Sequence, residues 1–435
     1  MGKELHYITV TFVIEAMASA NAIVQWKRLQ HMKRALQAES FDEDSTEDTP
    51  LFSPDSVEIN QSQLQRYYVI QEKIEMGQMA SLFFNRFGRS LFFLCFVVYL
   101  YGDLSIYAAA VSKSLMDVAC TNNSSTNLTM LDTDMCWEHM DFTRIGVYRL
   151  CLVGFLVTLG PFAFCDVQKT KYLQMFSTIL RQLAFAIMII TAVRDLIVDG
   201  PQGRPKAADV MGVPELFGAC VYSFMCHHSL PALVSPIADK SRLFSSLALD
   251  YLLIALFYLL LALTGVFAFE HVSDLYTLDF SQRWQGQEEF IVPRYFLALF
   301  PVFTLSTSFP IVAITLRNNL KSLFLTEGRH YRWCLRKVFF PLLAVIPPVL
   351  VAMATKNLEI LVGVTGSYAG AGIQYLIPAF LVFHARRETL KVIGMGVKND
   401  FESPFKGRAW VYFVVLWAVT CIILVSVNFI QSFLL

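Results

Sequence analysis

The chain has 435 residues, of which 55% are hydrophobic and 16% are charged, and its mean hydropathy is +0.50. A soluble domain of this length would not stay in solution with so apolar a composition, so the sequence indicates a membrane protein. The formal net charge is zero, which argues against a nucleic-acid partner, because such a partner needs a basic face. The nine cysteines include no CxxC pair, so we expect no metal site. We also expect no enzymatic activity, because an intramembrane aspartyl protease needs two carboxylates that share a proton, and the sequence offers no second site of this type beside Asp103.

Windows of about 20 apolar residues serve as the template for membrane-spanning helices. By this template the sequence predicts ten spans, at residues 6–24, 90–111, 146–165, 175–196, 215–237, 246–269, 293–316, 338–355, 359–384 and 409–432. The predicted fold class is therefore an all-α polytopic membrane protein. The first span differs from the others because it carries an acidic residue, Glu15, inside its apolar run.

Residues 25–89 form the longest polar insert between two spans. The insert starts with basic residues, as expected next to a cytosolic membrane surface. It continues as an acidic stretch that is short of aliphatic residues, which we expect to be partly disordered. From about residue 71 the pattern indicates a helix that lies against the membrane before the second span.

The loop at 112–145 has the character of a lumenal segment. It contains two cysteines and three glycosylation acceptor sequences, namely Cys120, Cys136, and those that begin at Asn122, Asn123 and Asn127. Acceptor sequences are used only on the lumenal side, and disulfides form in the same oxidising compartment. We therefore expect a disulfide between Cys120 and Cys136, unless the fold holds the two residues too far apart to bridge.

The distribution of Lys and Arg predicts the same orientation. Most basic residues of the later loops lie in 166–174, 237–245, 317–337 and 385–408, and few lie in 112–145, 195–213, 271–291 and 355–358. Because cytosolic loops carry the excess of Lys and Arg, the first group of loops is expected on the cytosolic side.

The span at 215–237 is interrupted in its middle by His227-His228-Ser229, which Pro231 follows. Proline removes an amide donor and obstructs the preceding turn, so we expect the helix to break or bend near His227. A freed carbonyl is costly in hydrocarbon, so such a break faces a protein interior or an aqueous cavity. Secondary transporters hold solutes and ions at such breaks. The alternative is an ordinary proline kink whose histidines bond to neighbouring helices.

Two prolines in 293–316 bracket a run of hydroxyl groups, on Thr304, Ser306, Thr307 and Ser308. Hydroxyl oxygens beside a bent turn can coordinate a small cation. Alternatively, Ser and Thr side chains bond to the carbonyls of their own helix.

Asp103 lies well inside the second span. A buried carboxylate in a membrane is a candidate proton carrier, and the alternative is a structural pairing with a base such as Arg181. A separate small-residue face in 359–384 is formed by Gly363, Gly366, Gly370 and Gly372. It is expected to serve helix packing rather than ligand contact.

Long motifs along the chain carry a family resemblance. Among them are FVIEAMASANA at 12–22, FGACVYSFMCHHSLPAL at 217–233 and GSYAGAGIQYLIPAFLVFHARRET at 366–389. With these motifs the chain resembles the transmembrane protein 104 family. That family is in turn similar to the amino acid and auxin permeases, which include the sodium-coupled neutral amino acid transporters.

The resemblance implies a fold of two inverted five-helix halves plus a final helix, with a solute between the broken first and sixth helices. In this scheme residues 1–24 are a remnant of the second helix, and 90–196 hold spans three to five. Residues 215–384 form the second inverted repeat, 385–408 are a basic cytosolic loop, and 409–435 hold the final span. A chain without the first helix and part of the second is expected to carry no flux.

The same resemblance implies the site residues. The sixth-helix break maps to Ser223, Phe224, Cys226 and His227, and with His228 these are the expected solute-binding residues. Relatives have Pro-Glu after the first histidine, where this chain has His228-Ser229. Ser308 matches a hydroxyl associated with sodium, Thr307 is adjacent to it, and Asp103 is the further candidate for ion coupling.

The implied function is secondary transport of a small neutral amino acid or a similar zwitterion, coupled to Na⁺ or H⁺. The expected partners are the lipid bilayer and the solute, with no other cofactor. The expected location is the plasma membrane or a lysosomal or endosomal membrane. The alternative is a membrane sensor or scaffold that keeps the permease fold without transporting.

Overall fold

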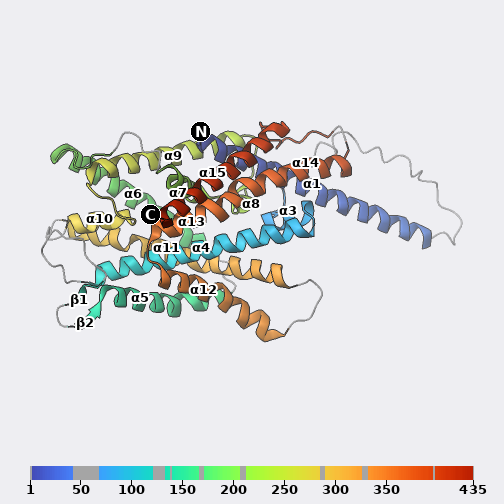
Figure 1. The fold of residues 1–435 in the computed structure, drawn as a ribbon. Helices are drawn as coiled ribbons and strands as arrows, with labels where there is room; N and C mark the ends of the chain where they lie inside the picture. The colour runs from blue at the N-terminus through green and yellow to red at the C-terminus, as the bar shows by residue number, and fades with distance from the viewer. Residues whose placement is uncertain are drawn as a thin grey trace. The chain divides into compact units, whose positions relative to one another are not determined.

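The computed structural model describes residues 2–42, 68–120, 133–137, 140–165, 171–205, 212–284, 290–325, 332–394 and 397–434. Within these residues the secondary structure is almost entirely helical (Figure 1), and nine helices are long and apolar enough to cross a membrane. The predicted span at 215–237 is not among the nine because it is divided into α7 (Val213–Ser223) and α8 (Leu230–Val234). The all-α polytopic class is confirmed.

Two compact units make up the chain. The first unit comprises Met1–Phe92, Ser223–Tyr251 and Ala371–Leu424, and the second comprises Phe93–Tyr222, Leu252–Gly370 and Val425–Leu435.

The first unit is built around α1 (Gly2–Asp42), which packs along α14 (Ile377–Val392) and also contacts α3 (Met76–Phe83) and α8 (Figure 1). The apolar window of α1 is 89% buried inside the protein. A helix that is apolar on all sides and is covered by protein on all sides lies in a core. The polar residues within this window therefore face other protein groups.

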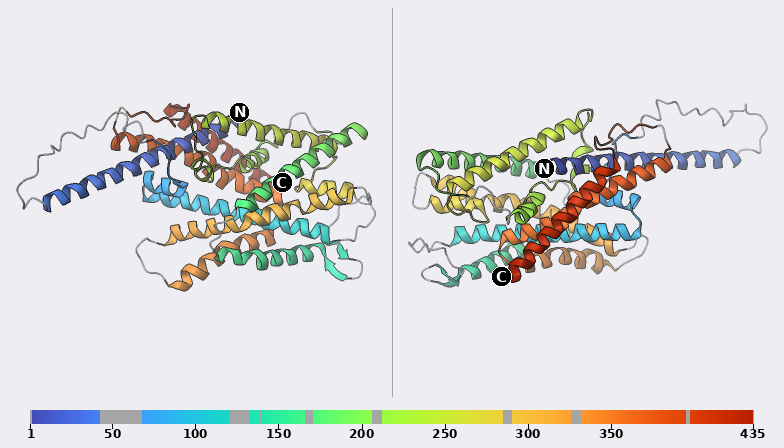
Figure 2. Two further views of the ribbon diagram at one scale, coloured as in Figure 1. Left: turned by 180° about the vertical axis from the view of Figure 1, so that it is seen from behind. Right: turned by 45° about the horizontal axis from the view of Figure 1, so that its top comes forward.

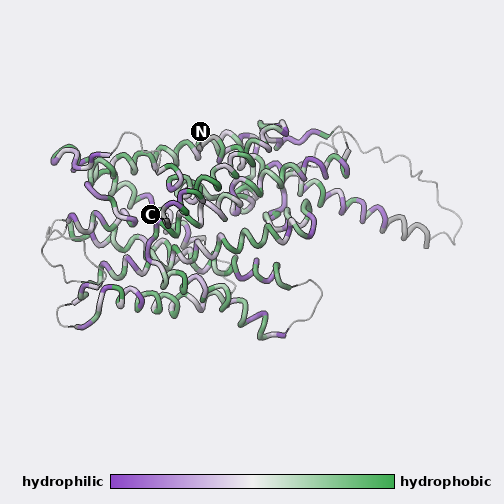
Figure 3. The backbone as a smooth tube through the Cα atoms, in the orientation of Figure 1, coloured by the Kyte–Doolittle hydropathy of each residue, from purple (hydrophilic) through white to green (hydrophobic). Residues whose placement is uncertain are grey.

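The helix α1 continues to Asp42, well past the predicted end at residue 24. Figure 3 shows that hydrophobic residues give way to hydrophilic residues along it. Two of its residues contact Glu72. The side chain of Asn21 exchanges hydrogen bonds with the main chain of Glu72, and Arg28 forms an ion pair with the Glu72 carboxylate. The hydrogen bond from Arg28 lowers the pKa of Glu72. The acidic stretch predicted to be disordered lies mostly outside the described residues.

The helix predicted to begin near residue 71 is α3. A capping box fixes its start, because the Glu75 main-chain N–H donates to the Gln78 side chain at 2.9 Å and Glu75 accepts in return. The chain leaves the helical conformation at Phe84. The Asn85 side chain then accepts from Gly88 N at 2.8 Å, and α4 (Arg86–Ala119) follows.

The second unit centres on α11 (Ile291–Phe324), which packs against α6 (Lys171–Val198), α10 (Tyr276–Arg283) and α12 (Phe340–Ala354). Its core cluster consists of Ala184, Met188, Ala192, Ala268, Phe269, Phe280, Trp284 and Leu297. The helix α5 (Arg144–Leu159) continues as a 3₁₀ turn, Gly160–Phe164.

Two further helices, α9 (Leu243–Ala268) and α15 (Arg408–Leu434), are predominantly apolar (Figure 3). Each is one continuous rod (Figure 2). Only 28% and 22% of their apolar windows, respectively, are buried in protein. Helices with this exposure need a lipid environment, because water does not tolerate so large an apolar surface.

A small hairpin follows α4. Its strands, β1 (Met135–Trp137) and β2 (Met140–Thr143), pair antiparallel. The structure joins Cys120 to Cys136 by a disulfide with a Cα–Cα distance of 4.6 Å, and the indole of Trp137 donates to Ala119 O at 3.0 Å. The acceptor residues Asn122, Asn123 and Asn127 lie outside the described residues.

The glycine-rich stretch is wound more widely than an α-helix. After α13 (Leu358–Val364) come two π-helical segments, Thr365–Gly370 and Gly372–Leu376, and then α14. A Cβ on Gly366 would lie 2.1 Å from the carbonyl oxygen of Gly218 in α7. The expected packing role is therefore confirmed for Gly366, because only glycine allows the two main chains to approach so closely.

We expect Gly366→Ala to lower the free energy of unfolding by about 2 kcal/mol, because the added methyl group forces the two main chains apart. The midpoint of thermal unfolding in detergent measures the effect. The matched control is Gly363→Ala, because nothing lies within 4 Å of a Cβ at that position. Equal midpoints for the two variants would contradict the packing role.

Candidate functional site

The helix predicted to break near His227 does so. The helix α7 ends at Ser223, α8 begins at Leu230, and residues 224–229 between them, which we call the break segment, are not helical. Pro231 lies in the first turn of α8, where its missing N–H is tolerated. The carbonyl of Cys226 accepts from Ser229 N at 3.0 Å and from Leu230 N at 3.1 Å. The break segment is thus an ordered turn.

His227 is the innermost residue of the break segment, with no exposed surface. Its Nε2 lies 2.8 Å from the hydroxyl of Thr9 in α1. The Thr9 hydroxyl also lies within hydrogen-bond distance of the carbonyls of Leu5 and His6. A hydroxyl has one proton, so when Thr9 donates to either carbonyl it accepts from Nε2–H of His227. The Nδ1 atom of His227 is then an acceptor, and this atom has no partner among the residues that the structure describes.

A second histidine, His6 in α1, lies in the same unit. Its ring stacks on Phe224 of the break segment with centroids 5.0 Å apart and on Tyr375 at 5.6 Å. The Nδ1 atom of His6 lies 3.1 Å from the Tyr375 hydroxyl and also contacts the side-chain amide of Gln374. Gln374 is fully buried, and its Oε1 has no partner within the described part of the chain.

The remaining predicted solute-binding residues differ in their contacts and in their burial. Phe224 also stacks on Tyr251 of α9 at 6.1 Å, and the Cys226 thiol lies 2.9 Å from the Tyr251 hydroxyl. Ser223 is the exposed last residue of α7, and His228 is partly buried. The first unit therefore brings Phe224, Cys226 and His227 together with side chains of α1, α9 and the second π segment.

The predicted ion-coupling residues belong to the second unit. The helix α11 continues without interruption through Pro310. The Thr307 hydroxyl donates to Thr304 O at 2.8 Å, and the Ser308 hydroxyl donates to the same oxygen at 3.2 Å. This is the alternative arrangement, in which hydroxyl groups bond to their own helix. Each oxygen still keeps lone pairs that a cation can use.

Asp103 is buried in α4 and accepts a hydrogen bond from the Tyr222 hydroxyl of α7 at 2.6 Å. Tyr107, one turn further along α4, also hydrogen-bonds to it. Among the described residues Arg181 does not form an ion pair with this carboxylate, so the partners of Asp103 are tyrosines.

Tyr222→Phe is expected to lower the free energy of unfolding by about 2 kcal/mol, since it removes a hydrogen bond to a buried carboxylate. Denaturant unfolding in detergent measures this effect. The control is Tyr412→Phe, because that side chain is exposed. If both variants unfold like the parent protein, Tyr222 does not stabilise the Asp103 site.

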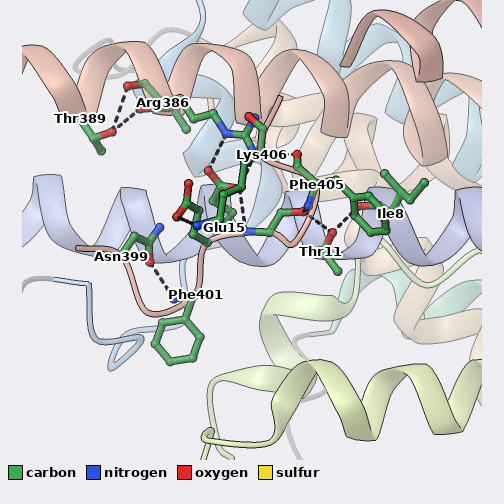
Figure 4. A network of polar contacts seen from close by, with 12 residues as sticks. Ile8, Thr11, Glu15, Arg386, Thr389, Asn399, Phe401, Phe405 and Lys406 are labelled. Carbon is green, nitrogen blue, oxygen red and sulfur yellow. Dashed lines mark hydrogen bonds and ion pairs between the residues drawn. The ribbon is translucent and has the colours of Figure 1, made fainter. Parts of the chain in front are cut away.

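A buried polar network connects α1, α14 and residues 397–407 (Figure 4). The Glu15 carboxylate, 3% exposed, accepts from Arg386 Nε at 2.7 Å and from Nη2 at 2.8 Å. It also accepts from Ser403 N at 3.0 Å, and the Ser403 and Thr11 hydroxyls lie 2.8 Å apart. Arg386 in turn donates to the Lys406 carbonyl at 2.9 Å. The network explains how a glutamate can lie inside an apolar helix.

Sequence reasoning did not identify several members of the site, namely His6, Thr9, Tyr251, Gln374 and Tyr375. A polar residue inside an apolar span is a signal for function, and it would have selected His6 and Gln374. Among the residues that the structure describes, no three His, Cys, Asp or Glu side chains lie close enough to hold a metal ion.

Comparison with known proteins supplies the family. Residues 60–427 match the profile of the family described as transmembrane amino acid transporter protein. The chain is 49% identical to a transmembrane protein 104 homolog from Drosophila melanogaster, and 48% identical to transmembrane protein 104 from Homo sapiens. Each match covers 98% of this chain and 88% of the relative. A homolog from Caenorhabditis elegans is 33% identical with the same coverage. The chain therefore belongs to the transmembrane amino acid transporter family, within its transmembrane protein 104 branch.

Proposed function

We propose that this protein is a secondary transporter that carries a small neutral amino acid or a similar zwitterion. The main support is the break segment, which sets a buried acceptor, His227 Nδ1, in the interior of the first unit. Breaks of this kind are where secondary transporters hold solutes. Membership of the amino acid transporter family supports the same class of solute.

The polarity of the site favours a solute with an ammonium group. An ammonium group has three N–H donors and no acceptor. His227 Nδ1 and Gln374 Oε1 are buried acceptors without partners among the described residues. A buried acceptor that stays unpaired costs free energy, so a donor group on the solute would be stabilised there. The neighbouring rings of Phe224 and Tyr251 favour an uncharged side chain on the solute.

We further propose that transport is coupled to Na⁺ or H⁺. The hydroxyl groups of Thr307 and Ser308 would hold Na⁺ through oxygen, whereas the Asp103 carboxylate would carry a proton. The proposed location is the plasma membrane or a lysosomal or endosomal membrane.

The test is counterflow of radiolabelled amino acids in proteoliposomes that contain the full-length protein. We expect saturable counterflow of one or a few neutral amino acids, and stimulation by a gradient of either Na⁺ or H⁺ but not of both. A Thr307→Ala/Ser308→Ala variant should lose a Na⁺ response, and Asp103→Asn should lose a H⁺ response. If a folded protein gives no counterflow with any amino acid, the proposal fails and a non-transporting sensor is favoured.

A further inference from the structure

A non-helical segment lies between α14 and α15 in the first unit. It comprises residues 397–407, which we call the strap. Within the strap, Phe401 N donates to Asn399 Oδ1 at 2.9 Å, and Phe405 N donates to Ser403 Oγ at 3.1 Å. The distribution of Lys and Arg along the chain predicts that this segment is cytosolic.

The strap lies along one face of α1 (Figure 4). Ser403 has no exposed surface, its hydroxyl lies 2.8 Å from that of Thr11, and its N–H donates to the Glu15 carboxylate at 3.0 Å. The Phe405 ring packs edge-on against Tyr7, with centroids 6.5 Å apart. Residues four positions apart lie on the same face of a helix. Tyr7, Thr11 and Glu15 therefore present one face of α1 to the strap.

Other residues of the same part of α1 belong to the solute site. Thr9 contacts His227, and His6 contacts Tyr375. Glu15 lies six residues beyond Thr9, which is about 9 Å along the helix axis, toward the end of α1 that is predicted to be cytosolic. The contact between the strap and α1 therefore runs from the level of the solute site toward the cytosol.

The solute site is closed in this structure. His227 and Gln374 have no exposed surface, and His6 is only 2% exposed. A solute reaches side chains buried to this degree only when a segment of the chain moves, as lids and loops do in other proteins. A non-helical segment that covers α1 is a better candidate for this movement than the packed helices α1 and α14.

Release of the strap would leave no isolated charge behind. The strap is attached through side chains of two helices, because Ser403 N donates to Glu15 of α1 and the Lys406 carbonyl accepts from Arg386 of α14 at 2.9 Å. Water can replace these hydrogen bonds at a low net cost, and Glu15 and Arg386 stay paired with each other. Gly394, at the α14 end, has a φ of +89°, a conformation that glycine adopts readily.

We propose that the strap is a gate on the cytosolic side of the solute site. It is closed in this structure, and it must leave α1 before a solute exchanges with the cytosol. This inference rests on the proposed function, because a gate controls exchange only in a protein that carries a solute. Its direct consequence is that a covalent bond between the strap and α1 stops transport.

A disulfide between the strap and α1 tests the proposal. The Thr11→Cys/Ser403→Cys variant places two thiols where the hydroxyl oxygens lie 2.8 Å apart, which a disulfide can bridge with a small shift. Counterflow of the amino acid that the parent protein carries is measured in proteoliposomes before oxidation, after oxidation and after renewed reduction. Oxidation should lower the rate by at least about tenfold, because the gate stays closed, and reduction should restore it. Peptide mapping by mass spectrometry verifies the new disulfide.

The matched controls are the single variants Thr11→Cys and Ser403→Cys, which keep the same native thiols as the double variant. Oxidation should leave their rates unchanged. If the oxidised double variant carries out counterflow as fast as the reduced one, the gate is overturned and the proposed function stands. Equal inhibition of the single variants would also overturn the gate, because the native cysteines would then explain the effect.

Alkylation measures the opening of the strap without any transport. In Ser403→Cys, a water-soluble maleimide cannot reach the new thiol while the strap is closed, because this position has no exposed surface. The matched variant is Ser19→Cys, at a position of α1 that is 2% exposed. Local opening should make position 403 react at least about tenfold faster than position 19, which requires unfolding of the helix.

Equal alkylation rates at positions 403 and 19 would overturn the gate. If the parent protein gives no counterflow with any amino acid, the proposed function fails, and the two alkylation rates still decide whether the strap opens.

Discussion

Arg386→Met is expected to lower the free energy of unfolding by about 3 to 5 kcal/mol, which would be the largest effect of any single substitution considered. The physical reason is the buried carboxylate of Glu15, which accepts two hydrogen bonds from the Arg386 guanidinium. Without Arg386, the Glu15 charge remains inside the protein without a counter-ion, and it accepts a hydrogen bond only from Ser403 N among the described residues. Denaturant unfolding in detergent micelles measures the loss.

Two matched variants separate this effect from a general sensitivity of α14. Arg387→Met changes the adjacent exposed arginine, and it should leave the stability within about 0.5 kcal/mol of the parent. Glu15→Gln/Arg386→Met removes both charges, so it should be more stable than Arg386→Met alone. If Arg386→Met and Arg387→Met destabilise the protein equally, the buried ion pair does not hold α1 against α14.

His227→Ala is expected to weaken solute binding by a factor of about 10 to 100, the range for one lost hydrogen bond to a charged group. The substitution removes the buried Nδ1 acceptor together with the contact between Nε2 and Thr9. The purified variant is titrated with the solute that gives counterflow. The rise in the thermal unfolding midpoint of the variant gives the dissociation constant of the solute.

Controls for this prediction come from the same residue and from an exposed histidine. His227→Gln keeps a side-chain acceptor and should bind the solute more tightly than His227→Ala does. His271→Ala changes an exposed residue and should bind like the parent protein. An unchanged dissociation constant in a folded His227→Ala variant would exclude His227 from the site.

The features that the sequence predicted correctly depend on local chemistry. Pro231 disfavours the helical conformation in the residues before it, and the break between Ser223 and Leu230 agrees with this local effect. The packing role of Gly366 was predictable because a residue without Cβ lets another main chain approach closely, but its partner Gly218 was not. In the same way, Thr307 and Ser308 bond to their own helix, which was the local alternative.

The features that the sequence did not predict depend on contacts between distant residues. Glu15 was visible as a glutamate in an apolar run, but its partner Arg386 is 371 positions away. His6 meets Gln374 across a separation of 368. Periodicity within one helix cannot reveal such partners. Beyond residue 24 of α1, the partner of Arg28 is likewise a distant residue, Glu72.

Protection of Cys226 from alkylation tests most directly the claim that a solute binds at the break segment. Cys226 is partly buried there and lies beside Tyr251. The other free cysteines are replaced by serine, except for the exposed Cys334 as an internal control. At ten times the dissociation constant, the solute should slow alkylation of Cys226 about tenfold and leave Cys334 unchanged. Unchanged alkylation of Cys226 in a preparation that still carries out saturable counterflow would contradict the claim.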